Sequence, residues 1–122
     1  TYMSDGKYPV VTGLEHDEYG HPTGKPALHS AMTAKRRNKL KKLAETFPTP
    51  KPHGPAEGQI LLVGWGSTWG PIREAVDKAR AAGHSVSGLN IRHLNPMPNG
   101  LENVFAGFRE VVVVENNDEG LY

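Results

Sequence analysis

The second half of the chain alternates between runs rich in apolar residues and amphipathic segments. The runs at residues 60–63, 85–91 and 111–114 each predict a β-strand. After the first run, apolar residues recur at three- and four-residue steps among charged ones until Gly83, which predicts an amphipathic helix. A shorter helix is predicted over residues 101–108. Strands that alternate with helices are typical of βαβ units and a parallel sheet.

This alternation predicts an α/β fold, in which crossover helices cover a mostly parallel sheet and form three layers with it. The last apolar run consists of valines only, from Val111 to Val114. A strand without polar alternation is typically covered on both faces of its sheet. No helix is predicted after this run, so we expect the natural domain to continue beyond Tyr122 or another subunit to cover the strand.

Residues 1–57 follow a different pattern and are predicted to form an N-terminal extension, with the α/β domain over residues 58–122. A short strand is predicted over residues 8–12, at a sheet edge because Pro9 cannot donate a ladder hydrogen bond. Residues 13–24 are dense in glycine, histidine and acids, which predicts a loop.

A basic helix and a proline-rich linker complete the predicted extension. The helix is predicted over residues 26–47, with Pro26 in its first turn, and most residues between 35 and 42 are Lys or Arg. Residues 48–55 contain four prolines, which predicts an extended, semi-rigid linker. The apolar face predicted for the helix consists of Leu28, Met32, Leu40, Leu43 and Phe47.

Composition narrows the function classes. The 122 residues carry a formal net charge of +1, so no general attraction to nucleic acid or membranes is expected. The basic helix has no interleaved aromatic residues, which argues against a nucleic-acid partner. No apolar stretch reaches the roughly 20 residues that span a bilayer, and we expect a cytoplasmic protein. The absence of cysteine excludes disulfides and an iron–sulfur cluster held by the chain's own thiolates.

A first candidate site is the turn after the first predicted strand, where an anion could be bound by Gly64, Gly66, Ser67 and Thr68. Such a turn points free N–H groups and the positive end of a helix dipole at the ligand. Its glycine spacing misses the dinucleotide fingerprint, and the second strand ends in a basic pair instead of a ribose-binding acid. A tight turn capped by Ser67 or Thr68 is therefore favoured. An independent module that binds nucleotides or small anions is the alternative function.

A second candidate is the acidic segment of Glu15, His16, Asp17 and Glu18. Its spacing matches no helical zinc motif, so no metal site is predicted. Carboxylates this close in sequence cannot be buried together without cationic partners, because each unpaired buried charge costs several kcal/mol. The basic helix is the nearest source of partners. The segment is predicted to be a loop that faces a partner or the substrate.

A polar group follows the last predicted strand and is formed by Glu115, Asn116 and Asn117. No Ser/His/Asp or Cys/His set has a recognisable spacing, and the histidines are scattered. The sequence therefore predicts no catalytic residue.

Two groups of motifs resemble one enzyme family. Residues 8–21, followed by the basic helix, resemble the TGxEHDExG segment in alpha subunits of 2-oxoacid:ferredoxin oxidoreductases, most closely the 2-oxoglutarate type. Residues 62–68, 72–76, 94–98 and 112–117 resemble the next domain of these subunits, which is similar to the C-terminal domain of transketolase. After Glu-Asn-Asn the family usually continues with Gly-Gln-Leu and a helix, whereas Asp118 follows here, so a truncated domain is expected.

The resemblance implies an enzyme that oxidatively decarboxylates a 2-oxoacid, transfers the acyl group to coenzyme A and reduces ferredoxin. Such enzymes use thiamine diphosphate with Mg²⁺ and at least one [4Fe–4S] cluster, and their beta subunit holds the diphosphate end of the thiamine cofactor. The implied role of this chain is that of a non-catalytic interface domain. Its implied partners are the beta subunit and the rest of the alpha subunit, and no cofactor is expected to bind this chain alone.

Overall fold

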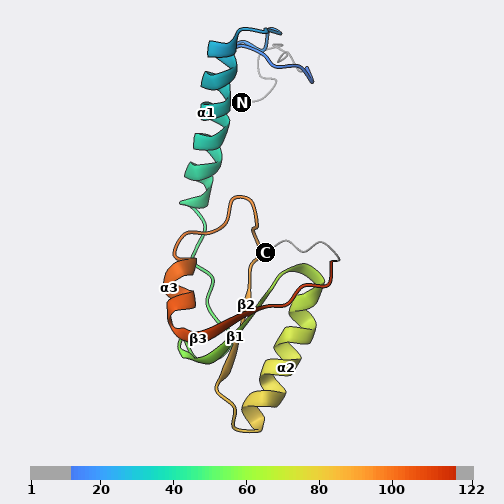
Figure 1. Cartoon of the computed structure of the whole chain (residues 1–122), viewed down its shortest axis with the longest axis vertical. Helices are drawn as coiled ribbons and strands as arrows, with labels where there is room; N and C mark the ends of the chain where they lie inside the picture. Colours follow the sequence, from blue (N-terminus) through green and yellow to red (C-terminus); the bar gives the residue numbers. More distant parts are fainter. Residues whose placement is uncertain (1–11, 118–122) are drawn as a thin grey trace, which may run out of the picture. The chain divides into compact units, whose positions relative to one another are not determined.

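The computed structural model describes residues 12–117 and divides the chain into two compact units, Thr1–Lys42 and Leu43–Tyr122 (Figure 1). The short strand predicted over residues 8–12 lies outside the described residues, apart from Thr12. The predicted boundary between residues 57 and 58 stays a prediction. Among residues 12–117, no helix is long and apolar enough to cross a membrane.

The second unit is built on a three-stranded parallel sheet. Its strands are β1 (Gly58–Gly64), β2 (Val86–Asn90) and β3 (Phe108–Val113), in the order β2-β1-β3. In the register of the sheet, Val63 lies between Leu89 and Val113. All three strands were predicted, and the α/β class with a parallel sheet is confirmed.

Helices α2 (Trp69–Ala81) and α3 (Leu101–Ala106) cover opposite faces of this sheet (Figure 1). The chain crosses from β1 to β2 in one direction and from β2 over β1 to β3 in the other. Right-handed crossovers in opposite directions place their helices on opposite faces.

The core is accordingly divided by the alternation of side chains along β1. Leu61 and Val63 belong to a buried cluster with Leu101 of α3, whereas Ile60 and Leu62 pack against the cluster that contains Ile72 and Val76 of α2. Because successive strand residues point to opposite faces, a single central strand contributes to both layers.

Within residues 12–117, no other element fully covers the valines of strand β3. Val111, Val112 and Val113 are 39%, 42% and 39% exposed, although they point alternately to the two faces. The reason is topological, because β3 is at the edge of the sheet and pairs only with β1 among the described strands. The cover that the sequence analysis expects from a continued domain or another subunit stays a prediction.

The opposite edge of the sheet is occupied by the proline-rich linker. His53 and Gly88 form an antiparallel bridge, in which the His53 N–H donates to the Gly88 carbonyl (2.7 Å) and the Gly88 N–H donates back (3.0 Å). The Ser87 hydroxyl donates to the Pro55 carbonyl (2.9 Å). The linker is extended as predicted, and it is also part of the sheet's hydrogen-bonded edge.

Helix α1 (Pro26–Ala44) ends three residues earlier than predicted. The N–H and hydroxyl of Thr46 both donate to the Leu43 carbonyl, and Pro48 disfavours a helical conformation at the preceding Phe47. The predicted apolar face is also only partly buried. Met32 is buried, but Leu40 is 40% and Leu43 45% exposed. Basic residues interrupt the apolar stripe, so helix formation here does not require a covered face.

Helix α3 likewise ends before its predicted boundary. It stops at Ala106, and Phe108 is the first residue of β3 with its side chain in the core cluster. Gly107 separates the two elements, and an added Cβ there would lie 2.6 Å from the Ala56 carbonyl oxygen. The chain can therefore turn sharply against the linker only with a glycine at this position.

Candidate functional site

The turn after β1 is closed by its own side chains. The Thr68 hydroxyl donates to the Trp65 carbonyl (2.8 Å) and accepts from the Trp65 N–H (3.1 Å). A Cβ on Gly64 would collide with side-chain atoms of Ile72 and Thr68, and Gly66 has a φ of 55°. Both glycines and Thr68 therefore have structural roles, and Ser67 is an exposed residue of the short 3₁₀ helix Gly66–Thr68.

Glu15 is the centre of an ion-paired cluster with α1. Its Oε1 accepts hydrogen bonds from Arg36 Nη1 (3.2 Å) and Nη2 (3.3 Å), and its Oε2 lies 2.5 Å from His29 Nδ1. The Arg36 guanidinium, followed by His29, lowers the pKa of Glu15 to about 2. The basic helix thus supplies, in Arg36, the kind of cationic partner that the sequence led us to expect.

Asp17 serves the loop itself. Its Oδ1 accepts from the backbone N–H groups of Tyr19 (2.9 Å) and His21 (3.0 Å), and these bonds, led by that from His21, lower its pKa. A bridge between His16 and Pro22 closes the loop. The two acids therefore have separate partners, and within residues 12–117 no group of three His, Cys, Asp or Glu side chains could hold a metal ion.

The outer surface of this loop is partly apolar. Leu14 is 65% and Tyr19 72% exposed, and Glu18 between them is exposed too. His16 points Nδ1 at the Leu14 carbonyl (3.2 Å). The sequence analysis selected the acids, but the side chains that face solvent here are mainly Leu14, Glu18 and Tyr19.

Glu115 shapes the segment after β3. Its Oε1 accepts from the Asn116 N–H (2.7 Å), the Asn117 N–H (3.0 Å) and the Asn117 side-chain amide (2.9 Å). The Asn117 N–H is the main cause of the lowered pKa of Glu115. Its Oε2 is buried and has no hydrogen-bond partner among the described residues. The three predicted polar residues are thus brought together.

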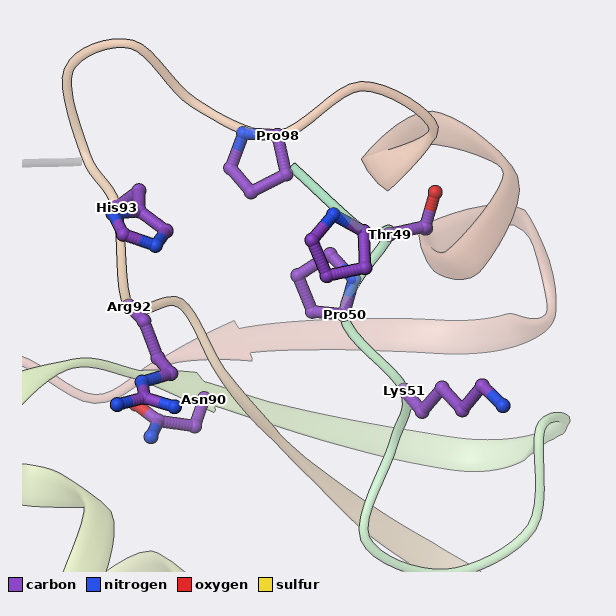
Figure 2. A pocket seen from close by; sticks show the side chains of 8 residues that line it. Thr49, Pro50, Lys51, Asn90, Arg92, His93 and Pro98 are labelled. Atoms are coloured by element: carbon purple, nitrogen blue, oxygen red, sulfur yellow. The ribbon is translucent and has the colours of Figure 1, made fainter. Parts of the chain in front are cut away.

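Two pockets lie at the carboxyl end of β2, and Figure 2 shows the first of them. The first has a volume of about 450 Å³ and lies between the proline-rich linker and the loop after β2. The second, of about 330 Å³, lies beside the turn after β1. Asn90 and Arg92 line both pockets. The first is lined by Pro48, Thr49, Pro50, Lys51, Asn90, Arg92, His93 and Pro98.

The wall of the larger pocket depends on contacts between distant segments. The rings of Phe47 and His93 stack with centroids 4.1 Å apart, and the Thr49 hydroxyl donates to the Asn99 carbonyl (3.0 Å). The sequence analysis did not select these residues. The only available signal was the basic pair at the end of the second strand, which had been used as an argument against ribose binding.

This chain is similar in sequence and in fold to known proteins. Residues 58–121 match the family model "pyruvate:ferredoxin oxidoreductase core domain II". The chain belongs to this family. The resemblance inferred from the sequence is therefore confirmed.

Two curated relatives of this chain are alpha subunits or KorA subunits of oxidoreductases. The chain is 39% identical over 112 residues to subunit alpha of 2-oxoacid:ferredoxin oxidoreductase 2 from Aeropyrum pernix, covering 88% of this chain and 17% of that protein. It is 35% identical to 2-oxoglutarate oxidoreductase subunit KorA from Mycobacterium tuberculosis, covering 89% of this chain and 18% of that protein. The chain thus spans less than a fifth of the length of these two relatives.

A solved structure resembles this chain over nearly the whole length of the chain. It is a 2-oxoglutarate:ferredoxin oxidoreductase from Magnetococcus marinus with 2-oxoglutarate, coenzyme A and succinyl-CoA bound. The similarity has a TM-score of 0.79 at 34% identity, and it covers 96% of this chain and 21% of that one.

Proposed function

We propose that this chain is part of the alpha subunit of a thiamine-diphosphate-dependent 2-oxoacid:ferredoxin oxidoreductase of the 2-oxoglutarate type. The complete enzyme would decarboxylate a 2-oxoacid oxidatively to an acyl-CoA and CO₂. The observation that carries the proposal is the similarity to the Magnetococcus marinus enzyme, which covers 96% of the chain. The family match includes the turn after β1, which supports this proposal over an independent nucleotide-binding module.

The cofactors implied by the family do not fit this chain's own residues. The sequence has no cysteine, so it offers no thiolate ligands for a [4Fe–4S] cluster. A Mg²⁺ ion needs oxygen ligands that converge, and the described acids form no such group. We infer that other parts of the complete enzyme bind thiamine diphosphate, Mg²⁺ and the cluster. The expected cytoplasmic location stays a prediction.

The proposed role of the chain is to form interfaces with the beta subunit and the rest of the alpha subunit. Contiguous exposed apolar side chains are typical of such surfaces. Among the described residues, exposed large apolar side chains occur in the acidic loop, near the end of α1 and on strand β3, where three of them are consecutive in the chain. The residues are Leu14, Tyr19, Leu40, Leu43, Val111, Val112 and Val113.

Within the loop, the acids would organise the surface that the partner contacts. Glu15 ties the loop to α1 through Arg36, and Asp17 holds the turn that carries Tyr19. His16 and Glu18 belong to the same proposed interface. Loss of the carboxylates would therefore displace the contact surface without removing any buried apolar group.

Replacement of Glu15 and Asp17 by Ala tests this interface role. In the 122-residue chain, we expect almost no change in the thermal midpoint of the α/β unit, because both residues lie in the other compact unit. In the complete oxidoreductase, we expect impaired co-purification of the beta subunit and reduced turnover of 2-oxoglutarate. Glu102→Ala, which removes an exposed acid from α3, is the matched control.

Two results would contradict the proposal. One is normal assembly and turnover of the complete enzyme with both acids replaced, which would remove the interface role. The other is turnover of a 2-oxoacid by the isolated chain supplied with thiamine diphosphate, Mg²⁺, coenzyme A and an electron acceptor. The second result would show that the chain holds a catalytic site.

A further inference from the structure

The two pockets at the end of β2 share a pair of hydrogen-bonding side chains. Asn90 and Arg92 line both, and Figure 2 shows the Arg92 side chain extending toward Asn90. Within residues 12–117, none of the ion pairs involves Arg92. A guanidinium presents five N–H donors in a planar fork that matches the oxygens of a phosphate or carboxylate. This group is therefore available to an external anion.

The electrostatics of both pockets favour an anion. Among the described residues, the lining includes Arg92 and Lys51 but no carboxylate. Lys51 points away from Arg92 in Figure 2, so it adds a positive charge at the rim and no direct contact. Charges of one sign in a cleft with low-dielectric walls concentrate ligands of the opposite sign.

The opposite wall of the larger pocket is apolar. It consists of Pro48, Pro50 and Pro98, and His93, which also lines the pocket, stacks on Phe47 next to Pro48 in the chain. Proline rings offer a rigid surface for a flat ring of a ligand. The volumes of about 450 and 330 Å³ lie within the range of small-molecule sites, which is roughly 300–1,000 Å³.

The position in the fold is also one where ligands bind. Both pockets are lined by residues at the carboxyl end of β2, and the smaller one also lies next to the turn after β1. In open α/β sheets, ligands bind in the crevice outside these strand ends. Four observations on the described part of the chain point to the same region: Arg92 has no ion-pair partner there, no acid of that part lines the pockets, the prolines form a wall, and the pockets lie at a strand end.

We infer that this groove binds the phosphate of a nucleotide at Arg92, with the nucleotide's ring against the proline wall. Asn90 supplies the second polar contact, and its amide can bond either to the phosphate or to the ribose. The inference does not rest on the proposed oxidoreductase function, because it concerns only side chains of this chain.

The test is a titration of the ¹⁵N-labelled 122-residue chain, followed by two-dimensional NMR. The three probes are ADP, inorganic phosphate and adenosine, which separate the phosphate from the ring. We expect ADP to cause saturable shifts at the amides of Asn90, Arg92 and His93, with a dissociation constant of about 0.1–1 mM. Phosphate and adenosine alone should each bind at least about 5-fold more weakly.

Arg92→Ala and Arg73→Ala each remove one positive charge, so the second variant is the control for the first. Arg92→Ala should weaken ADP binding about 10-fold, because charge-assisted bidentate bonds are lost. Arg92→Lys should keep part of the affinity, since the charge remains without the fork. Arg73→Ala removes an exposed cation from α2 that lines neither pocket, and it should leave the affinity unchanged.

Three outcomes would overturn the inference. The first is the absence of saturable shifts up to about 10 mM ADP, a concentration well above the expected dissociation constant. The second is an equal loss of affinity in Arg73→Ala and Arg92→Ala, which would indicate general charge attraction. The third is inorganic phosphate binding as tightly as ADP, which would mean that the proline wall contributes nothing.

Discussion

Substitutions at Val63 and Val113 test how far the side chains of β3 are exposed to solvent. The two residues are register partners in neighbouring strands and lie on the same face of the sheet. Val63 is 2% exposed and Val113 is 39% exposed. Replacing each by Ala is the same chemical change, so a difference in free energy of unfolding reports on the packing and burial of the two sites.

The magnitudes follow from what each change removes. Val63→Ala deletes two buried methyl groups and leaves a cavity in the core cluster with Leu61 and Leu89, which should cost about 2–3 kcal/mol. Val113→Ala removes groups that water already reaches, and no closed cavity forms. It should therefore cost only about 1 kcal/mol.

The assay is urea unfolding of the 122-residue chain, monitored by the fluorescence of its tryptophans. The slope of free energy against urea concentration should be equal in all three proteins if only stability changes. Equal losses for the two variants would refute the argument, because β3 would then be covered. Repeating the measurement at several protein concentrations would reveal whether a second copy supplies that cover.

Two further predictions concern the loop and the turn. Because the folded pKa of Glu15 is lowered to about 2 from an ordinary 4.5, the stability contribution of its pairing is fully present above pH 4.5 and is lost as the pH falls toward 2. The carboxyl resonance of Glu15 and the side-chain resonances of Arg36 should follow this titration in NMR, and a midpoint near 4.5 would contradict the pairing. Gly64→Ala should lower the free energy of unfolding by roughly 1–3 kcal/mol in the urea assay, because the added Cβ meets Ile72 and Thr68, whereas Gly70→Ala has open space and should cost much less.

Local patterns account for most of the secondary structure. The apolar run at residues 60–63 forms a strand, and Ile72 and Val76 lie on the buried face of a helix. Both patterns were readable in the sequence because they depend on residues that are near neighbours in the chain. The motifs of the acidic loop and of the α/β domain together indicated the family, which the match over residues 58–121 confirms. The positions at which helices α1 and α3 end were less accurate, because hydrogen bonds such as that from Thr46 to Leu43 and the first contacts of Phe108 compete with helix extension.

The site was much less predictable than the elements. Glu15, Asp17 and Glu115 were selected by residue type, but the sequence indicated only some of the groups that they bind. The proximity of the basic helix made a cationic partner for Glu15 predictable, whereas the choice of Arg36 and His29 depends on how the loop folds back. The pocket at Arg92 was not predicted, because Pro48 and Pro50 in its wall are about 40 residues from Arg92 in sequence.

By itself, the sequence determined the alternation of strands and helices, the α/β class and the family, since each of these depends on periodicity or on contiguous motifs. The tertiary structure decided which strand is central and which is at the edge. Four consecutive valines in Val111–Val114 look like a buried strand in any local window, but exposure depends on the neighbours that strand order provides. The groove around Arg92 has the same origin, because only folding brings the linker and the end of β2 together, and no local pattern records contacts between segments so far apart.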